Sequence, residues 1–239
     1  MDYPEGATPL DPDEMKGLKY KHVTTRGELD HLEQANMQSG IQWMKKSTKK
    51  HILNEVFVRD LHRKLFGDVW KWAGTFRTTE KNIGVDPQQI GVDLRMLLDD
   101  VRYWIDHDSY SPEEIAVRFH HRLVLIHPFA NGNGRHARIM ADALLMKRFE
   151  RPPVDWAGGY DLQAMGTRRK EYITALRTAD RGSYAALFDL PEYKERMSSA
   201  MLLRRNPRKI LPALNTRHRL AYESRPAPYK SGLAFCLRG

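Results

Sequence analysis

Apolar residues recur at three- and four-residue spacing along most of the chain, which predicts a helical protein. The clearest runs cover about 53–66 and 88–107. A further helix is expected to begin near Arg26, because Thr25 and Glu28 have the spacing of a capping box. The pattern therefore places helices through the first half of the chain.

The middle of the sequence carries strong signals for helix ends. Ser111-Pro112-Glu113-Glu114 predicts a helix start, since it combines a capping serine, a first-turn proline and two acids favoured by the helix dipole. That helix is expected to stop before Pro128, because the residue preceding a proline disfavours helical geometry. The run RHARIMADALLMKRF, after Gly134, is apolar nearly all round and predicts a central, buried helix. Two more helices are predicted at about 161–179 and 182–188.

The segment from Trp70 to Gln89 breaks the helical pattern. Glycines and a proline separate short stretches that contain threonine, isoleucine and valine. This predicts a small hairpin or extended loop between helices, at about Thr75 to Val85. The expected fold class is all-α with one small β element.

Composition narrows the class of protein. The chain has 239 residues, of which 41% are hydrophobic and 29% charged, an ordinary globular balance. No apolar run approaches the ~18 residues that a membrane-spanning helix needs, and the N-terminus lacks the basic and apolar stretches of a secretory signal. Cys236 is the only cysteine, which excludes an intrachain disulfide and a multi-cysteine metal site. These features predict a cytoplasmic protein with no membrane partner.

The positive charge is concentrated in one segment. Residues 191–239 contain 11 lysines and arginines against 3 acids, so they hold +8 of the formal net charge of +9. Such a basic tail is typical either of a solvated extension or of a segment that contacts nucleic acid or an acidic partner. A non-catalytic nucleic-acid-binding protein is therefore one alternative, although no helix-turn-helix, zinc-finger or RNA-binding signature supports it.

The stretch from His127 to Arg138, HPFANGNGRHAR, has the features of a polyphosphate site. Its glycines allow backbone N–H groups to converge, and the start of the following helix adds donors and positive dipole. Arg135 and Arg138 are three residues apart on that helix, so both are expected to face one ligand. A histidine next to them is suited to abstract a proton near pH 7.

Several of these residues also have structural explanations. Phe129 is expected to pin the polar loop to the core, and His127 alone is compatible with a buried core histidine. Of the histidines nearby, His120 and His121 point about 100° apart on a helix and lack a convergent cysteine or pair of acids. We therefore expect His120 and His121 to be packing or surface residues and not zinc ligands.

The twelve residues together resemble the signature of the Fic/Doc family, H-x-F-x-[D/E]-G-N-G-R-x-x-R, at every specified position except Asn131. The likeness extends over about 50–190. It includes the helical context, the element near 75–85, which resembles the family's flap, and EYITALRTADRGSY, which resembles its next helix with Tyr172, Leu176, Asp180 and Tyr184. The N-terminal YPEGATPLDPDE and EQAN segments resemble the subgroup called mobile mystery protein B.

This resemblance implies a bundle of about six to eight helices with a small β-hairpin flap. It implies three regions: an arm with a possible inhibitory helix (1–49), a catalytic domain (50–190) and a basic extension (191–239). The implied reaction is transfer of AMP from ATP to a Ser, Thr or Tyr hydroxyl of a target protein that docks on the flap. The roles implied by position are a general base for His127, a loop anchor for Phe129, an anion cradle for Gly132, Asn133 and Gly134, and binding of the β- and γ-phosphates for Arg135 and Arg138.

Asn131 stands where the family has a Mg²⁺-binding acid. Because an amide offers one carbonyl oxygen and no negative charge, we expect weakened Mg²⁺ binding. The resemblance also implies an inhibitory glutamate that masks Arg138. Glu33, or alternatively Glu28, is the candidate; a capping or exposed position explains either acid equally well, and a separate antitoxin protein is the other expected restraint. Phosphoryl or phosphocholine transfer by the same loop is a further alternative reaction.

Overall fold

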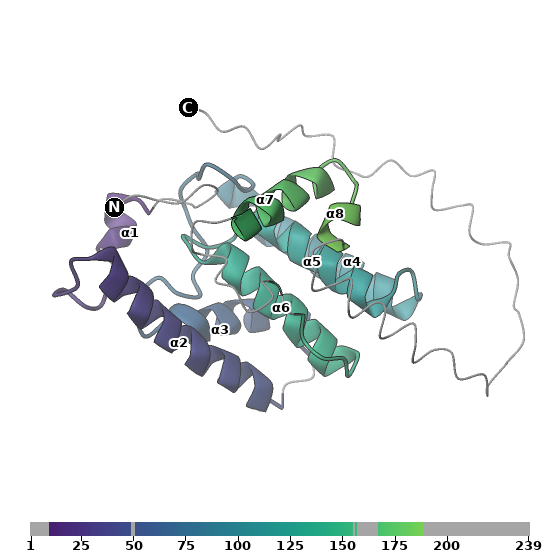
Figure 1. Ribbon diagram of the computed structural model, residues 1–239, viewed down its shortest axis with the longest axis horizontal. Coiled ribbons are helices and arrows are strands. Elements are labelled where there is room, and N and C mark those ends of the chain that lie inside the picture. Colours follow the sequence, from purple (N-terminus) through teal and green to yellow (C-terminus); the bar gives the residue numbers. More distant parts are fainter. Residues whose placement is uncertain (1–9, 49–50, 155, 157–166, 189–239) are drawn as a thin grey trace, which may run out of the picture.

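The computed structural model describes residues 10–48, 51–154, 156 and 167–188. Over these residues the chain is helical, with connecting loops (Figure 1). Its elements in order are α1 (Pro12–Met15), α2 (Arg26–Lys46), α3 (Glu55–Phe66), the 3₁₀ turn η1 (Pro87–Gln89), α4 (Ile90–Asp106), α5 (Pro112–Ile126), α6 (Asn133–Arg148), α7 (Thr167–Ala179) and α8 (Ala185–Phe188).

Helix α6 lies at the centre of the arrangement. It packs along α5 and also contacts α2 and α3, while α4 covers the far side of α5 (Figure 1). Its residues Ala137, Met140, Ala141 and Leu144 have no exposed surface. The prediction of a central, buried helix after Gly134 is therefore confirmed.

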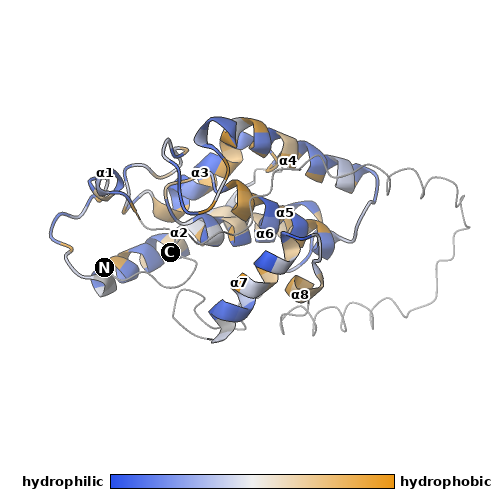
Figure 2. Cartoon of the chain, turned by 90° about the horizontal axis from the view of Figure 1, so that it is seen from above, coloured by the Kyte–Doolittle hydropathy of each residue, from blue (hydrophilic) through white to orange (hydrophobic). Residues whose placement is uncertain are grey.

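The flanking helices are amphipathic. Helix α4 shows hydrophobic residues on one side and hydrophilic residues on the other (Figure 2). Its buried residues follow the predicted three- and four-residue spacing: Ile90, Leu94, Leu97, Leu98, Val101 and Trp104. Helix α3 buries a similar stripe and, within it, one polar side chain, His62.

The predicted helix ends are confirmed. Thr25 Oγ1 accepts a hydrogen bond from the Glu28 N–H at 3.3 Å, and the Glu28 carboxylate accepts one from the Thr25 N–H at 3.1 Å. Ser111 caps α5, which ends at Ile126, before Pro128. Helix α8 is shorter than expected at Ala185–Phe188, and the predicted first turns of the helix at 161–179 lie outside the described residues.

Residues 75–85, called the flap segment below, form a loop, which is one of the two structures expected for this segment, and not the β-hairpin that the family resemblance implies. The segment makes one isolated antiparallel bridge, between Phe76 and Phe129, and contains no strand. The buried guanidinium of Arg77 donates to the carbonyl oxygens of Thr79, at 2.8 Å, and Val85. The side chain of Arg77 thus joins the two ends of the loop. A hairpin would instead join them by backbone hydrogen bonds between its two strands.

None of the described helices is long and apolar enough to cross a membrane. The basic extension, 191–239, and most of the YPEGATPLDPDE segment lie outside the described residues.

Candidate active site

His127 sits at the point where α5 ends. Its backbone has left-handed geometry, with φ of 53°, which turns the chain away from the helix axis before Pro128. The side chain is buried, and its Nδ1 lies 3.2 Å from the carbonyl oxygen of Val124. Since a carbonyl only accepts, Nδ1 carries the proton and Nε2 carries the lone pair.

Burial governs the charge of this histidine. Desolvation lowers the pKa of His127 from 6.5 to about 3, and the positive charges of Arg77 and Lys81 act in the same direction. The ring is therefore neutral at pH 7 and its Nε2 is able to accept a proton. The Nε2 lone pair is what a general base needs, but the low pKa makes His127 a weak base in the free protein.

The loop after His127 is held by Asn133 and Phe129. Asn133 Oδ1 accepts from the Phe129 N–H at 2.9 Å, and Asn133 Nδ2 donates to the Phe129 carbonyl at 2.8 Å. The Phe129 ring is fully buried and stacks on the His62 ring, with 3.7 Å between centroids. The side chain of Asn133 thus closes the loop, and its backbone N–H is among the donors at the helix start that have no acceptor within the helix.

The glycines next to Asn133 have different roles. Gly132 has φ of 76°, and a Cβ there would lie 2.6 Å from the Phe66 ring, so this position excludes a side chain on both grounds. A Cβ at Gly134 would meet only Arg138 Nη1, at 3.8 Å. No side chain caps the N-terminus of α6, whose first N–H groups have no intrahelical acceptor. Gly134 therefore keeps the space beside Arg138 open at a helix end that favours anions.

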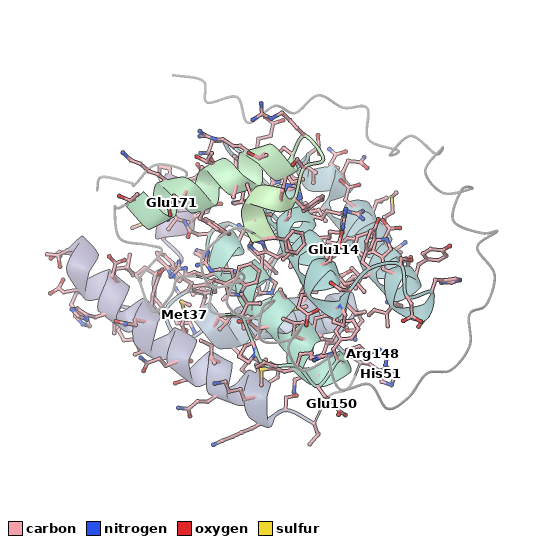
Figure 3. The ribbon with its side chains drawn as sticks, turned by 45° about the vertical axis from the view of Figure 1, so that its right-hand side comes forward. Met37, His51, Glu114, Arg148, Glu150 and Glu171 are labelled. Atoms are coloured by element: carbon pink, nitrogen blue, oxygen red, sulfur yellow. The ribbon has the colours of Figure 1, made fainter. Side chains whose placement is uncertain are left out.

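The two arginines are directed to different helices. Arg135 forms an ion pair with Glu33 of α2, with 2.5 Å between Nη1 and Oε2, and its guanidinium lies over the Phe66 ring at 4.6 Å. Met37 also reaches from α2 toward α6, with its sulfur 3.6 Å from Arg135 Nη1 (Figure 3). Arg138 instead lies over the ring of Tyr172 on α7, at 5.4 Å. The expectation that both arginines face one ligand is not met in this conformation, because Glu33 holds Arg135 toward α2.

The same ion pair corrects the expected partner of Glu33. The predicted contact was with Arg138, whereas the carboxylate binds Arg135 and also accepts a hydrogen bond from Trp70 Nε1 at 2.7 Å. Both charged side chains are largely buried. The alternative acid, Glu28, is exposed and caps α2, which matches its structural explanation.

Both oxygens of Asn131 accept hydrogen bonds. Its Oδ1 accepts from the Gly132 N–H at 2.6 Å, and its backbone oxygen accepts from His62 Nε2 at 3.1 Å. Among the described residues no three His, Cys, Asp or Glu side chains are grouped so as to hold a metal ion. This donor set does not fit a protein-held Mg²⁺, because one amide oxygen already in a hydrogen bond supplies too few hard ligands.

His62 is a residue of the site that sequence reasoning missed. It is completely buried, accepts the Gly74 N–H on Nδ1 at 3.0 Å and donates from Nε2 to Asn131. Burial lowers its pKa well below the usual value, so the ring stays neutral and keeps this one tautomer. It therefore joins the start of the flap segment to the loop that follows His127.

The flap segment lies directly against His127. Arg77 Nε donates to the His127 carbonyl at 2.7 Å, and the Arg77 N–H donates to Pro128 at 2.9 Å. Near the other end of the flap segment, Gly84 has φ of 112°, and a Cβ there would lie 2.7 Å from His127 Cβ. Only glycine permits this approach, so the loop crosses immediately over the histidine.

The two histidines considered for zinc are packing residues. His120 Nε2 lies 2.9 Å from Tyr172 Oη, and His121 Nε2 lies 2.8 Å from Asp180 Oδ1. The Tyr184 hydroxyl is 3.2 Å from His121 Nδ1. These contacts join α5 to α7 and to the start of α8, and they place Tyr172 under Arg138.

Comparisons with known proteins bear on the family and fold of this chain. Residues 52–145 match the Fic/DOC family. The protein adenylyltransferase fic-1 of Caenorhabditis elegans is 30% identical over 164 residues, which are 64% of this chain and 30% of that protein. The protein adenylyltransferase Fic of Drosophila grimshawi is 32% identical over 132 residues, 52% of this chain and 27% of that protein. The chain thus spans about a third of the length of these curated relatives.

Solved structures show the same fold. The structure of C. elegans Fic-1 (residues 134–508) superposes with a TM-score of 0.57 at 26% identity, over 79% of this chain and 54% of that one. BepC of Bartonella tribocorum, solved with bound AMPPNP, also gives a TM-score of 0.57, at 19% identity, over 75% of this chain and 96% of that one. With the motif, the helical fold and these likenesses in agreement, residues 52–145 form a Fic/DOC family domain.

Proposed function

We propose that this chain transfers AMP from ATP to a hydroxyl side chain of a target protein. The observation that carries the proposal is a buried, neutral histidine, His127, in the turn that leads into the uncapped, glycine-lined start of α6, where Gly134 leaves open the space next to Arg138. The names of the C. elegans and Drosophila relatives, protein adenylyltransferases, support the same reaction.

In the proposed reaction, His127 Nε2 removes the proton from the target hydroxyl. The hydroxyl oxygen attacks the α-phosphorus, a new P–O bond forms, and the bond from the α-phosphorus to the bridging oxygen breaks to release pyrophosphate. The N–H groups at the start of α6 and the guanidinium of Arg138 stabilise charge on the phosphate oxygens. Gly134 leaves the room that these oxygens need.

Bound ATP also raises the pKa of His127. In the free protein, the pKa of His127, about 3, makes it a weak base at pH 7. A triphosphate placed beside the ring brings negative charge, which favours the imidazolium and raises the pKa toward neutrality. The histidine thus becomes an effective base when substrate is present.

The side chains at Asn131 do not supply a metal cage, so no step here is assigned to a protein-held ion. If Mg²⁺ accompanies ATP, Asn131 would be a weak ligand for it at most, since its one amide oxygen already accepts a hydrogen bond.

We further propose that Glu33 restrains the enzyme by holding Arg135 away from the phosphates. The buried ion pair must open before Arg135 reaches a ligand, and its partner Trp70 keeps the carboxylate in place. Restraint by a separate antitoxin and a nucleic-acid contact of the basic tail stay predictions.

The test uses pure protein with ATP labelled on the α-phosphate or on the γ-phosphate, beside a His127→Ala variant. AMP transfer leaves label on protein only from the α position, and the variant removes it. Label from the γ position would instead indicate phosphoryl transfer. Absence of label from either position, together with salt-dependent nucleic-acid binding, would favour the non-catalytic alternative.

A further inference from the structure

The N-terminal arm, residues 10–20, packs along the chain that leads into the flap segment. Trp72 Nε1 donates to the Glu14 carbonyl at 3.0 Å, and the Lys71 N–H donates to the Gly17 carbonyl at 2.9 Å. A Cβ on Gly17 would lie 2.5 Å from Trp72 Cδ1. The fit is close enough that the arm and the approach to the flap segment form one unit.

Two acids of this arm enclose a lysine of the flap segment. Lys81 Nζ lies 2.8 Å from Asp11 Oδ2 and 2.5 Å from Glu14 Oε2, and the lysine side chain is only 3% exposed. Thr79 Oγ1 donates to the same Asp11 oxygen at 3.0 Å. A buried ammonium without partners is costly, so these carboxylates are what allow Lys81 to point inward.

The contact continues to His127 through the same loop. Arg77 and Val85 donate their N–H groups to residues 128 and 126, on either side of His127, at 2.9 and 3.4 Å. The guanidinium of Arg77 also donates to the His127 carbonyl. A displacement of Lys81 therefore acts on the loop that covers the candidate base.

We propose that Asp11 and Glu14 are positioning residues of the candidate site, which clasp Lys81 and thereby hold the flap segment against residues 126–128. The role of this clasp in presenting a target hydroxyl rests on the proposed function. The existence of the clasp does not depend on that function, so the clasp and its docking role are tested by separate measurements.

The first measurement is hydrogen exchange of the Arg77 and Val85 amides in the full chain. An Asp11→Asn/Glu14→Gln variant should exchange at these two amides on the order of tenfold faster, since charge-assisted hydrogen bonds are lost. Asp13→Asn is the matched control, because Asp13 lies on the same turn, is 89% exposed and pairs with Lys16 instead. Unchanged exchange in α6 amides shows that the fold is retained.

A second pair of variants replaces Lys81, on the flap-segment side of the contact, and leaves the residues of α1 unchanged. Lys81→Met should accelerate exchange at the same two amides, and combining it with the arm variant should add little further change. Lys81→Arg keeps the charge and should restore slow exchange. Either of two results would overturn the clasp. One is that the arm variant and Lys81→Met exchange no faster than Asp13→Asn; the other is that their separate effects simply add when the variants are combined.

The second measurement separates docking from nucleotide binding. With α-labelled ATP, the arm variant should self-label about tenfold more slowly while its Kd for a non-hydrolysable ATP analogue changes less than about twofold. Faster exchange with unaltered self-labelling would overturn the docking role. If the unmodified chain fails to self-label from ATP, the proposed function fails, and the exchange data still decide the clasp.

Discussion

Glu33 on α2 and Arg135 on α6 are 102 residues apart in sequence, and their side chains meet in a largely buried ion pair. The arginine belongs to the loop and helix start proposed to bind the phosphates of ATP, and the acid belongs to a helix outside the matched domain. The positive charge of Arg135 is already neutralised by a carboxylate of the protein. Under the proposed function, ATP and the Glu33 carboxylate would compete for this guanidinium.

Replacing Glu33 should therefore increase nucleotide affinity. We expect Glu33→Gln to bind a non-hydrolysable ATP analogue about tenfold more tightly and to self-label faster, because Arg135 loses a charge-assisted bond worth ~1.5 kcal/mol or more. Glutamine keeps an oxygen for the Trp70 indole N–H, so packing is preserved. Isothermal titration with the analogue measures the change.

Glu28→Gln is the control for this effect, since it removes the same charge from the first turn of α2 without reaching α6. It should leave the affinity unaltered and weaken only the helix cap. If both variants bind nucleotide as the unmodified chain does, Glu33 has a structural role alone.

Asn131 offers a test of metal use. Asn131→Asp adds a negative charge just before α6 and would offer Mg²⁺ a hard anionic ligand that the amide does not supply. The concentration of Mg²⁺ needed for half-maximal self-labelling should fall by about tenfold. An equal charge at the exposed Ser109, which lies at the opposite end of α5 from His127, serves as control in the variant Ser109→Asp. An unaltered Mg²⁺ requirement would count against Asn131 as the metal-facing residue.

The sequence predicts the helices well because their signals are local. Thr25, Ser111 and Pro128 act on their own neighbours through capping and steric restriction, so their effects can be read without the fold. The motif was predictable for the same reason, since His127 to Arg138 is contiguous. Contacts between distant segments are different in kind: nothing in the spacing of Glu33 indicates that it meets Arg135.

The sequence left two structures open for the flap segment, a hairpin or an extended loop, because the choice depends on one long side chain. Threonine, isoleucine and valine between glycines favour strands locally. Arg77 instead spans the loop and satisfies three carbonyl oxygens, which removes the need for a cross-strand ladder. His62 was missed for a related reason: a single polar residue on the apolar face of α3 gives no sign of the two backbone groups that it bridges.

His62→Phe is expected to destabilise the protein and loosen the loop at Asn131. Phenylalanine retains the stacking on Phe129 but removes the ring nitrogens that bond the Gly74 N–H and the Asn131 carbonyl, at a cost of about 1–3 kcal/mol for the buried Gly74 N–H alone. Urea denaturation measures the loss in unfolding free energy. His107→Phe, at an exposed position on the end of α4, should change it by less than about 0.5 kcal/mol.

Acid should destabilise the fold before any carboxylate titrates. Burial lowers the pKa of both His127 and His136 from 6.5 to about 3. Above pH 6.5 these rings are neutral in both the folded and the unfolded chain. As the pH falls below 6.5 the unfolded chain takes up protons that the folded chain excludes, so the unfolding free energy declines until the pH reaches about 3.

At pH 5, which is 1.5 units below the unfolded value, each histidine should cost about 2 kcal/mol of stability relative to pH 7. Urea denaturation at the two pH values gives the difference. His136→Phe removes one titrating ring together with its hydrogen bond to Val58, so it lowers stability at both pH values but should reduce the difference between them by about 2 kcal/mol. A pH difference as large in this variant as in the unmodified chain would show that His136 is protonated in the folded state, and that its burial does not exclude the charge.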